Sequence, residues 1–250
     1  MGRLSRGLLL LLLPVLALTA AVKEVDRRYQ RGLQAYANQQ WDLAVQEFES
    51  IVASSYDSEV LYYNLGNAYY RLEDIAGAVW AYEKALLLDP NDEDARYNLS
   101  LTNLRVPDRI EPPEVPLFIR FYRSIRGSFT PAEWIQWVSV LLLAIAALFA
   151  LGKWRPRLRI GWLTATGMVL VVLLALVTVD SLITASQTRT GIIYGDAVGV
   201  YSAPTERSTR LFELHRGLKV DINEQAGGWY QIELLDGKSG WLPADRLRTL

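Results

Sequence analysis

The chain has 250 residues, a net charge of −1, one histidine and no cysteine. The lack of cysteine excludes disulfides, thiolate metal sites and cysteine nucleophiles. The near-neutral charge argues against nucleic-acid binding, because such proteins carry a basic surplus that neutralises phosphates. A chain of this length holds two or three small domains.

The first segment, residues 1–21, has the layout of a secretory signal. Two arginines precede an apolar run at residues 8–18, and small residues follow at 19–21. The run is short for a membrane span, but an uncleaved signal anchor remains the alternative. Both interpretations predict that the chain after this segment leaves the cytoplasm.

Residues 22–105 contain an internal repeat at an offset of 34 residues, which places Gly32 over Gly66 and Phe48 over Tyr82. A period of this length predicts stacked helical hairpins. Close packing explains the residue types, since glycine lets two antiparallel helices approach and an aromatic ring fills the space around the contact. The second copy resembles the tetratricopeptide repeat family, and its matches to the signature positions are Tyr62, Leu65, Gly66, Tyr69, Ala78, Tyr82, Ala85 and Pro90.

The first copy, about residues 25–58, departs from that family at three positions. Arg28, Arg31 and Ala35 stand where Trp, Leu and Tyr are usual. Residues 92–105 restart the pattern and then stop, which predicts a capping helix. Because two repeats and a cap bury little apolar surface, we expect self-pairing or a partner to complete the stack.

The resemblance also implies a concave groove that binds a segment of another protein. Tyrosine suits this role because it combines a rigid apolar face with a hydroxyl group. Tyr62, Tyr69 and Tyr82 are instead expected in the core. The repeats carry 8 basic and 14 acidic side chains, which favours a basic or neutral partner, and the basic residues of carboxylate-binding members are not evident. The predicted groove residues are Tyr29, Tyr36, Tyr63, Asn64, Asn67, Tyr70, Tyr97 and Asn98.

A linker is predicted at residues 106–130. Its four prolines favour a stiff, extended spacer, for which we expect no binding role. Within residues 117–127 most apolar side chains share one face of a helix, while Arg120, Arg123 and Arg126 point away and Ile119 breaks the pattern. The residues on that face are Leu117, Phe118, Phe121, Tyr122 and Ile125. This pattern predicts an interfacial helix on anionic lipid, and an ordinary linker with a positively charged flank fits it equally well.

Two transmembrane helices are predicted at residues 131–152 and 160–180, because each segment is long and apolar enough to cross a bilayer. Thr130 and Glu133 form a capping box ahead of the first helix. The short loop between the helices, residues 153–159, belongs in the cytoplasm by the positive-inside rule. Both flanking domains then lie on the outer side. The cations of this loop are Lys153, Arg155, Arg157 and Arg159.

Residues 187–250 show short alternating runs broken by turns, which predict a small all-β barrel. The segments GGWYQIEL and DGKSGWLPADRL make this part resemble a bacterial SH3-like domain. That family implies a ligand surface of exposed aromatic residues, for which the candidates are Tyr201, Trp229, Tyr230 and Trp241. Alternation does not place Trp229 and Ile232 on one face, so some of the candidates must belong to the core. Polyproline binding is not implied, because the acidic, tyrosine-rich segment it needs is not recognisable.

No pattern in the chain predicts catalysis. His215 is the sole histidine, and neither a serine-nucleophile motif nor a phosphate-binding glycine loop is present. We therefore expect no enzyme activity, no cofactor and no metal site. The expected fold is multidomain: all-α tetratricopeptide hairpins, two transmembrane helices and a C-terminal SH3-like barrel.

The order of these parts resembles one bacterial family, the BatE proteins of the Bacteroides aerotolerance group. The resemblance implies a non-enzymatic scaffold in the bacterial inner membrane, with both folded domains in the periplasm and a link to oxidative stress or envelope integrity. Relatives are encoded with membrane proteins that bear von Willebrand A domains and with a MoxR-type ATPase. The expected partners are such envelope proteins, membrane lipids and peptidoglycan, but no nucleic acid. The alternatives are a peptidoglycan-binding module that anchors or recruits a cell-wall enzyme, and a purely structural subunit.

Overall fold

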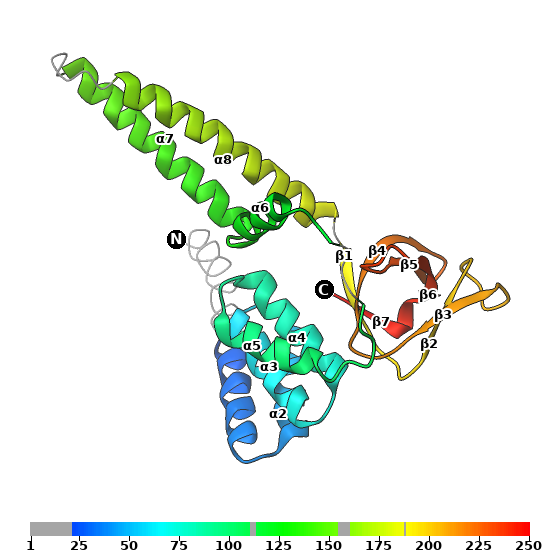
Figure 1. Ribbon diagram of the computed structural model, residues 1–250. Helices are drawn as coiled ribbons and strands as arrows, with labels where there is room; N and C mark the ends of the chain where they lie inside the picture. The colour runs from blue at the N-terminus through cyan, green and yellow to red at the C-terminus, as the bar shows by residue number, and fades with distance from the viewer. Residues whose placement is uncertain (1–21, 111–113, 155–160, 188) are drawn as a thin grey trace, which may run out of the picture.

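The computed structural model describes residues 22–110, 114–154, 161–187 and 189–250 (Figure 1). The predicted signal and the three arginines of the basic loop lie outside these ranges. The fold class is the expected one: a helical repeat domain, two long apolar helices and a C-terminal antiparallel sheet.

The repeat domain consists of antiparallel helical hairpins. Asp74 and Asp92 are the N-caps of two of the helices, because their carboxylates accept hydrogen bonds from the backbone N–H groups of Gly77 and Ala95, each at 2.9 Å. The predicted capping helix is therefore present. The helical segments are residues 22–37, α2 (Trp41–Val52), α3 (Glu59–Arg71), α4 (Ile75–Leu88) and α5 (Glu93–Asn103).

Glycine allows the helices of each hairpin to approach closely. A Cβ atom on Gly66 would lie 2.6 Å from the Tyr82 ring, and one on Gly32 would lie 2.5 Å from the Phe48 ring. The internal repeat of the sequence is thus a repeat of one packing contact. Tyr62, Tyr69 and Tyr82 are buried, as predicted.

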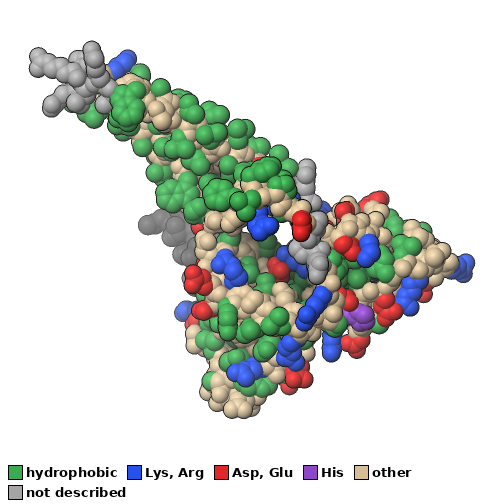
Figure 2. Space-filling view, viewed as in Figure 1, with side chains coloured by type: hydrophobic (Ala, Val, Ile, Leu, Met, Phe, Trp, Pro, Cys, Tyr) green, Lys and Arg blue, Asp and Glu red, His purple; other side chains and the backbone are tan. Residues whose placement is uncertain are grey.

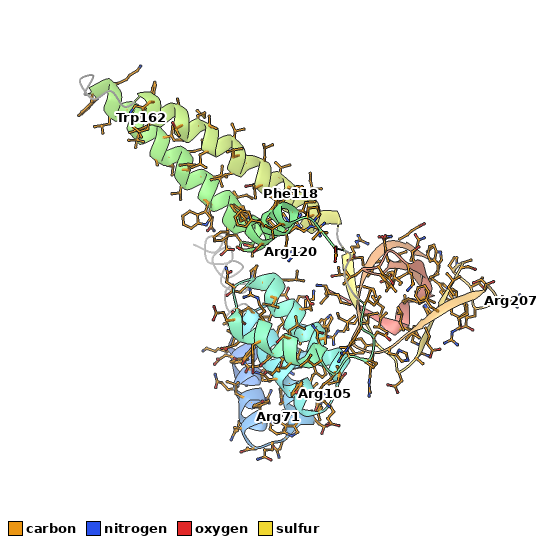
Figure 3. The ribbon with its side chains drawn as sticks, viewed as in Figure 1. Arg71, Arg105, Phe118, Arg120, Trp162 and Arg207 are labelled. Atoms are coloured by element: carbon orange, nitrogen blue, oxygen red, sulfur yellow. The ribbon has the colours of Figure 1, made fainter. Side chains whose placement is uncertain are left out.

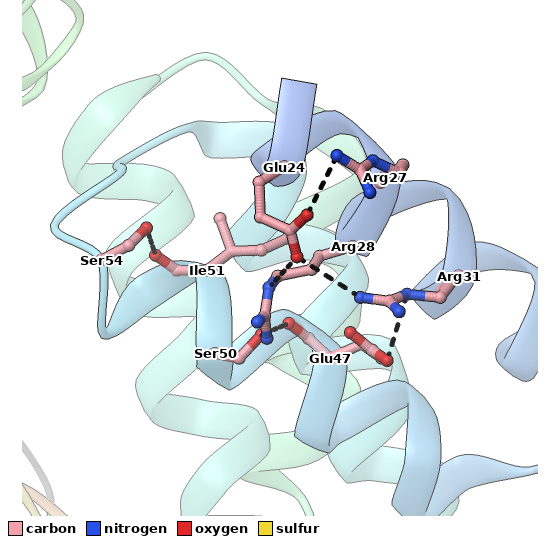
Figure 4. Close-up of polar contacts among 8 residues, drawn as sticks. All are labelled: Glu24, Arg27, Arg28, Arg31, Glu47, Ser50, Ile51 and Ser54. Atoms are coloured by element: carbon pink, nitrogen blue, oxygen red, sulfur yellow. Dashed lines mark hydrogen bonds and ion pairs between the residues drawn. The ribbon is translucent and has the colours of Figure 1, made fainter. Parts of the chain in front are cut away.

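Ion pairs replace apolar contacts on the outer face of the first repeat (Figure 4). Arg28 donates to Glu24 at 2.9 Å and to the Ser50 hydroxyl at 2.8 Å. Arg31 lies 3.3 Å from a carboxylate oxygen of Glu47. The bonds to Ser50 and Glu47 join the first helical segment to α2, and they explain why arginines occupy two positions that the family usually fills with Trp and Leu.

The hairpin of α7 (Pro131–Trp154) and α8 (Gly161–Gln187) is long and apolar enough to cross a membrane, with mean hydropathies of 2.3 and 2.5 in its two helices. The predicted capping box is present, because the Thr130 N–H donates to Glu133 at 2.7 Å and the Glu133 N–H to the Thr130 hydroxyl at 3.3 Å. Hydrophobic side chains cover the hairpin along its length (Figure 2). The helix α6 (Leu117–Gly127) lies across its base (Figure 1).

The C-terminal domain is a seven-stranded antiparallel sheet with the strand order β3-β2-β6-β5-β4-β1-β7. Its inner face buries Ile192, Val200, Ile232 and Leu242. The strands are β1 (Arg189–Ile193), β2 (Val198–Tyr201), β3 (Arg210–Leu214), β4 (Lys219–Ala226), β5 (Trp229–Glu233), β6 (Ser239–Pro243) and β7 (Leu247–Thr249), with a short 3-10 helix, η1 (Ala244–Arg246), before the last.

The sheet domain packs directly on the repeats, and the two share one continuous hydrophobic core. All residues from Ile75 to Tyr82 in α4 are buried, because α3 and α5 cover one side of the helix and the sheet covers the other. Trp80 donates its indole N–H to the Thr249 carbonyl at 2.8 Å. We expected self-pairing or a partner protein to cover the apolar surface of the short repeat stack. In the structure the C-terminal sheet domain of the same chain covers α4.

The start of the linker, residues 106–110, is part of this interface. Val106 is buried and contacts the turn at Gly217. The Asp108 carboxylate accepts the His215 backbone N–H at 2.6 Å, and its second oxygen lies 2.8 Å from the His215 Nδ1 atom. The lone histidine therefore has a structural position.

Candidate functional site

A groove with a volume of about 350 Å³ opens on the repeats, on a face formed by α3, α5 and the first helical segment. Tyrosine and asparagine dominate its surface. The residues that line it are Tyr36, Tyr63, Asn67, Tyr70, Arg71, Tyr82, Asn98 and Leu101.

Hydrogen bonds between successive repeats fix two of the tyrosines. The side-chain amide of Asn64 donates to the Tyr29 hydroxyl at 2.9 Å, and that of Asn98 donates to the Tyr63 hydroxyl at 3.5 Å. The two bonds are related by the repeat period. Tyr97 is the next residue in this ladder and is 63% exposed.

The floor of the groove is a polar cluster centred on Asn67. The side-chain oxygen of Asn67 accepts from the Tyr82 hydroxyl at 2.7 Å and from the Asn98 amide at 2.9 Å. Burial raises the pKa of Tyr82, so its hydroxyl stays protonated and keeps donating. Since the Asn67 oxygen already accepts from Tyr82 and Asn98, the Asn67 amide N–H groups remain as donors for a bound segment.

The groove is locally cationic, although the repeats as a whole are acidic. Among the lining residues only Arg71 carries a charge. Its guanidinium lies 5.5 Å from the centroid of the Trp41 ring, and a hydrogen bond to Tyr36 raises its pKa. Arg105, labelled in Figure 3, lies 5.3 Å from the centroid of the Tyr70 ring and pairs with Glu73 at 3.5 Å. The net charge of the repeats is therefore a poor guide to the charge that a partner meets.

The eight predicted groove residues fall into two sets. Tyr36, Tyr63, Asn67, Tyr70 and Asn98 line the groove together. The others lie outside it: Tyr29 lines a separate hollow of about 930 Å³, Asn64 is bonded to Tyr29, and Tyr97 stands at the open end of the ladder.

Sequence reasoning missed Arg71 and Leu101. The repeat period offered a signal for both, because Arg71 aligns with Arg105 and Leu101 aligns with Asn67 at the offset of 34.

The sheet register divides the aromatic candidates of the C-terminal domain between two faces. Tyr201 and Gln231 are both direct partners of Trp241 in neighbouring strands, and Trp229 is two residues from Gln231. Tyr201, Trp229 and Trp241 therefore share the outer face, because side chains alternate along a strand. The Tyr201 and Trp229 rings meet edge to face, with 5.7 Å between their centroids. These three residues are called the aromatic face below.

Tyr230 belongs to the opposite face, where it pairs with the buried Leu242 and packs against the core. Tyr230 is therefore not part of the same surface as Tyr201, Trp229 and Trp241, which corrects its assignment to the ligand surface. The sequence had signalled that some candidate must be internal, and the strand register identifies which one.

The described ranges contain no group of three or more His, Asp or Glu side chains that could hold a metal ion. The acidic side chains near the interface are instead committed to cations, as with Glu83, which accepts from the Lys219 ammonium at 2.7 Å.

Two family models match the parts of the chain described above. Residues 60–92 match the tetratricopeptide repeat, and residues 196–248 match the bacterial SH3 domain. The chain thus combines a tetratricopeptide repeat, a bacterial SH3-like domain and two helices that are long and apolar enough to span a membrane.

A curated protein is also similar to part of the chain. Over 116 residues the chain is 28% identical to a peroxisomal targeting signal receptor of Candida glabrata. The match covers 46% of this chain and 20% of that receptor, so the chain spans about a fifth of the relative's length.

Proposed function

We propose that the protein is a non-enzymatic scaffold of the bacterial inner membrane, which binds a segment of an envelope protein in the groove of its repeats. The groove carries this proposal. It presents tyrosine hydroxyls, the Asn67 amide and the Arg71 guanidinium beside half-buried rings, and such a surface donates hydrogen bonds while it packs against apolar side chains. The bound segment therefore supplies hydrogen-bond acceptors.

The location of the groove follows from the domain interface. Because Arg248 contacts Glu49, the repeats and the sheet domain share one side of any membrane that α7 and α8 cross. The match to a bacterial SH3 domain and the basic loop predicted at residues 153–159 both support the periplasmic side. Partners of the kind that the BatE resemblance implies, membrane proteins with von Willebrand A domains, would then meet the groove outside the cytoplasm.

Photo-crosslinking in native membranes tests this function. A photoreactive phenylalanine analogue at Tyr63, or at Leu101 where it disturbs less packing, is expected to form adducts with a specific protein. Tyr56 provides a control, since it is an exposed tyrosine of the same domain that does not line the groove. The proposal fails if positions 63 and 101 capture only lipid, or the same proteins as position 56.

A peptidoglycan-binding module is the second candidate, and the aromatic face favours it. Half-buried indole and phenol rings that share one side of a small barrel can stack on sugar rings and peptide stems. Binding of the full chain to cell-wall sacculi separates the two functions. Replacement of Trp229 and Trp241 by alanine is expected to abolish retention, whereas Tyr230→Phe on the inner face is not; retention that survives the double replacement rejects this candidate.

A further inference from the structure

We propose that α6 is an interfacial amphipathic helix, which inserts its apolar face into the outer leaflet and binds anionic phospholipid headgroups with Arg120 and Arg123. This inference adds a lipid contact to the scaffold, and it does not depend on which partner the groove binds.

The level of the bilayer surface can be read from the aromatic and charged residues of the hairpin. Trp154 and Trp162 are exposed at one end, and Trp137 is exposed at the other. The distance from Trp137 to Trp154 is 17 residues, or about 26 Å of helix. From Trp162 to Asp180 it is 18 residues, or about 27 Å. Both values fit a hydrocarbon core of about 30 Å, so Trp137 and Asp180 mark the outer boundary.

Hydrogen bonds hold α6 at that boundary. Asp180 accepts from the Tyr122 hydroxyl at 2.8 Å and from the Arg126 guanidinium at 3.2 Å. Arg126 also donates to the Thr184 hydroxyl at 2.7 Å, and its own carbonyl accepts from the indole N–H of the buried Trp134 at 3.1 Å. The helix is thereby fastened to both spans. Of the three arginines expected to point away from the apolar face, Arg126 instead turns toward α8.

The apolar face of α6 has no cover among the described residues. Leu117, Phe118 and Phe121 are 78%, 72% and 67% exposed. Arg120 and Arg123 make no ion pair or hydrogen bond with any described side chain, so both guanidinium groups are free for a ligand. In Figure 3 Phe118 lies on the side of α6 away from the repeats, and Arg120 lies on the side toward them.

A bilayer leaflet is the occupant that this arrangement fits. The exposed rings continue the apolar surface of α7 and α8, which the membrane itself covers. The free arginines face the headgroup layer, where phosphates offer bidentate acceptors. The repeat domain meets this region at the turn after α6, where Asn91 donates to the Ser128 carbonyl at 2.8 Å, while Leu117, Phe118 and Phe121 stay exposed.

Site-directed spin labelling of the full chain tests the orientation, and the absence of native cysteine makes each label unique. The protein is placed in nanodiscs of phosphatidylcholine mixed with phosphatidylglycerol, with nitroxides at Phe118→Cys or Arg120→Cys. Leu143→Cys in α7 and Arg207→Cys in the sheet domain give the lipid and water references. We expect position 118 to resemble 143, with several-fold lower accessibility to a water-soluble nickel chelate than position 120.

Two results would overturn the inference. A label at 118 that the nickel chelate reaches as easily as the label at 120 would place the face in water. A label at 118 that is shielded from both the chelate and oxygen would assign the face to a protein partner.

The headgroup contact has its own test. In detergent, added phosphatidylglycerol is expected to raise the melting temperature of the full chain, whereas phosphatidylcholine is not. The double variant Arg120→Gln/Arg123→Gln should lose most of that rise, and Arg207→Gln, which removes an exposed arginine far from α6, should keep it. If the double variant keeps the full rise, these arginines do not hold anionic lipid.

Discussion

The guanidinium carbon of Arg248 lies 3.3 Å from the centroid of the Trp80 ring, and the same side chain donates to both carboxylate oxygens of Glu49, at 2.9 and 3.0 Å. One cation thus joins the last strand of the sheet to α2 and α4. Burial alone would lower the pKa of Arg248, but Glu49 and Tyr194 outweigh that effect and raise it. The guanidinium group of Arg248 is therefore charged at neutral pH.

Replacement of Arg248 by methionine is expected to weaken the joint between the domains. The variant keeps apolar contact with Trp80 but leaves Glu49 largely buried without its cation, which costs about 2 kcal/mol. That loss lowers the melting temperature of the full chain by about 5 °C. Thermal unfolding in detergent measures it, and a double-mutant cycle with Glu49→Gln should give a coupling of about 1 kcal/mol. Strict additivity of the two replacements would show that the pair does not stabilise the joint.

Gly66→Ala is expected to destabilise the repeats by about 1–3 kcal/mol through overpacking. The added methyl group would lie 2.6 Å from the Tyr82 ring, which is buried and held by its hydrogen bond to Asn67, so the ring has no room to move. The matched control is Gly161→Ala in α8, where no described atom lies within 4 Å of the new methyl group. Its melting temperature should stay level or rise slightly, since alanine favours helix. An equal loss in both variants would contradict the packing argument.

Alkaline pH is expected to destabilise the repeats, and the free energy of unfolding should fall more steeply with pH than it would if the tyrosines were exposed. Burial raises the pKa of Tyr62, Tyr69 and Tyr82 above the usual value of about 10. As the pH rises through about 10, the unfolded chain releases these protons while the folded chain keeps them, so the free energy of unfolding falls. The stabilisation is fully present below that pH and is lost above it.

Melting temperatures measured across the alkaline range test this pH dependence. Tyr82→Phe should show a shallower fall, because it removes one of the groups concerned. Phenylalanine fits at this position, since Phe48 occupies the equivalent place in the first repeat. A fall as steep as in the unmodified chain would argue that Tyr82 does not contribute.

Features set by neighbours in the sequence could be predicted. The contact of Gly66 with Tyr82 recurs at a fixed period, and the capping box of Thr130 and Glu133 depends on four consecutive residues. The groove was predicted in part for the same reason, because Tyr63 repeats Tyr29 and Asn98 repeats Asn64 at the offset of 34 residues. The repeat period could not tell which tyrosine hydroxyls already have a hydrogen-bond partner within the chain. The Tyr29 hydroxyl, for example, accepts from the Asn64 amide.

Features set by distant residues could not be predicted. Glu49, Trp80 and Arg248 are ordinary residues of three separate elements, and only the folded chain brings them together. The position of His215 beside Asp108 could not be predicted for the same reason, because the two residues are distant in the sequence. Alternation alone likewise left the faces of the sheet unassigned until the pairing of Tyr201 with Trp241 fixed the register.

The contact of Arg248 with Glu49 also predicts how the chain lies in the membrane. Both residues must occupy one compartment, so an even number of spans separates the repeats from the sheet domain, in agreement with the two helices of the hairpin. Single cysteines at Tyr56 and Arg207 are therefore expected to react with a membrane-impermeant maleimide from the same side, and a cysteine at Trp154 from the opposite side. Labelling of intact cells followed by labelling of lysed cells measures the sides. Tyr56 and Arg207 are both exposed, so a difference in their labelling would reflect the side of the membrane rather than burial. Such a difference would contradict the contact of Arg248 with Glu49, which requires both domains to share one compartment.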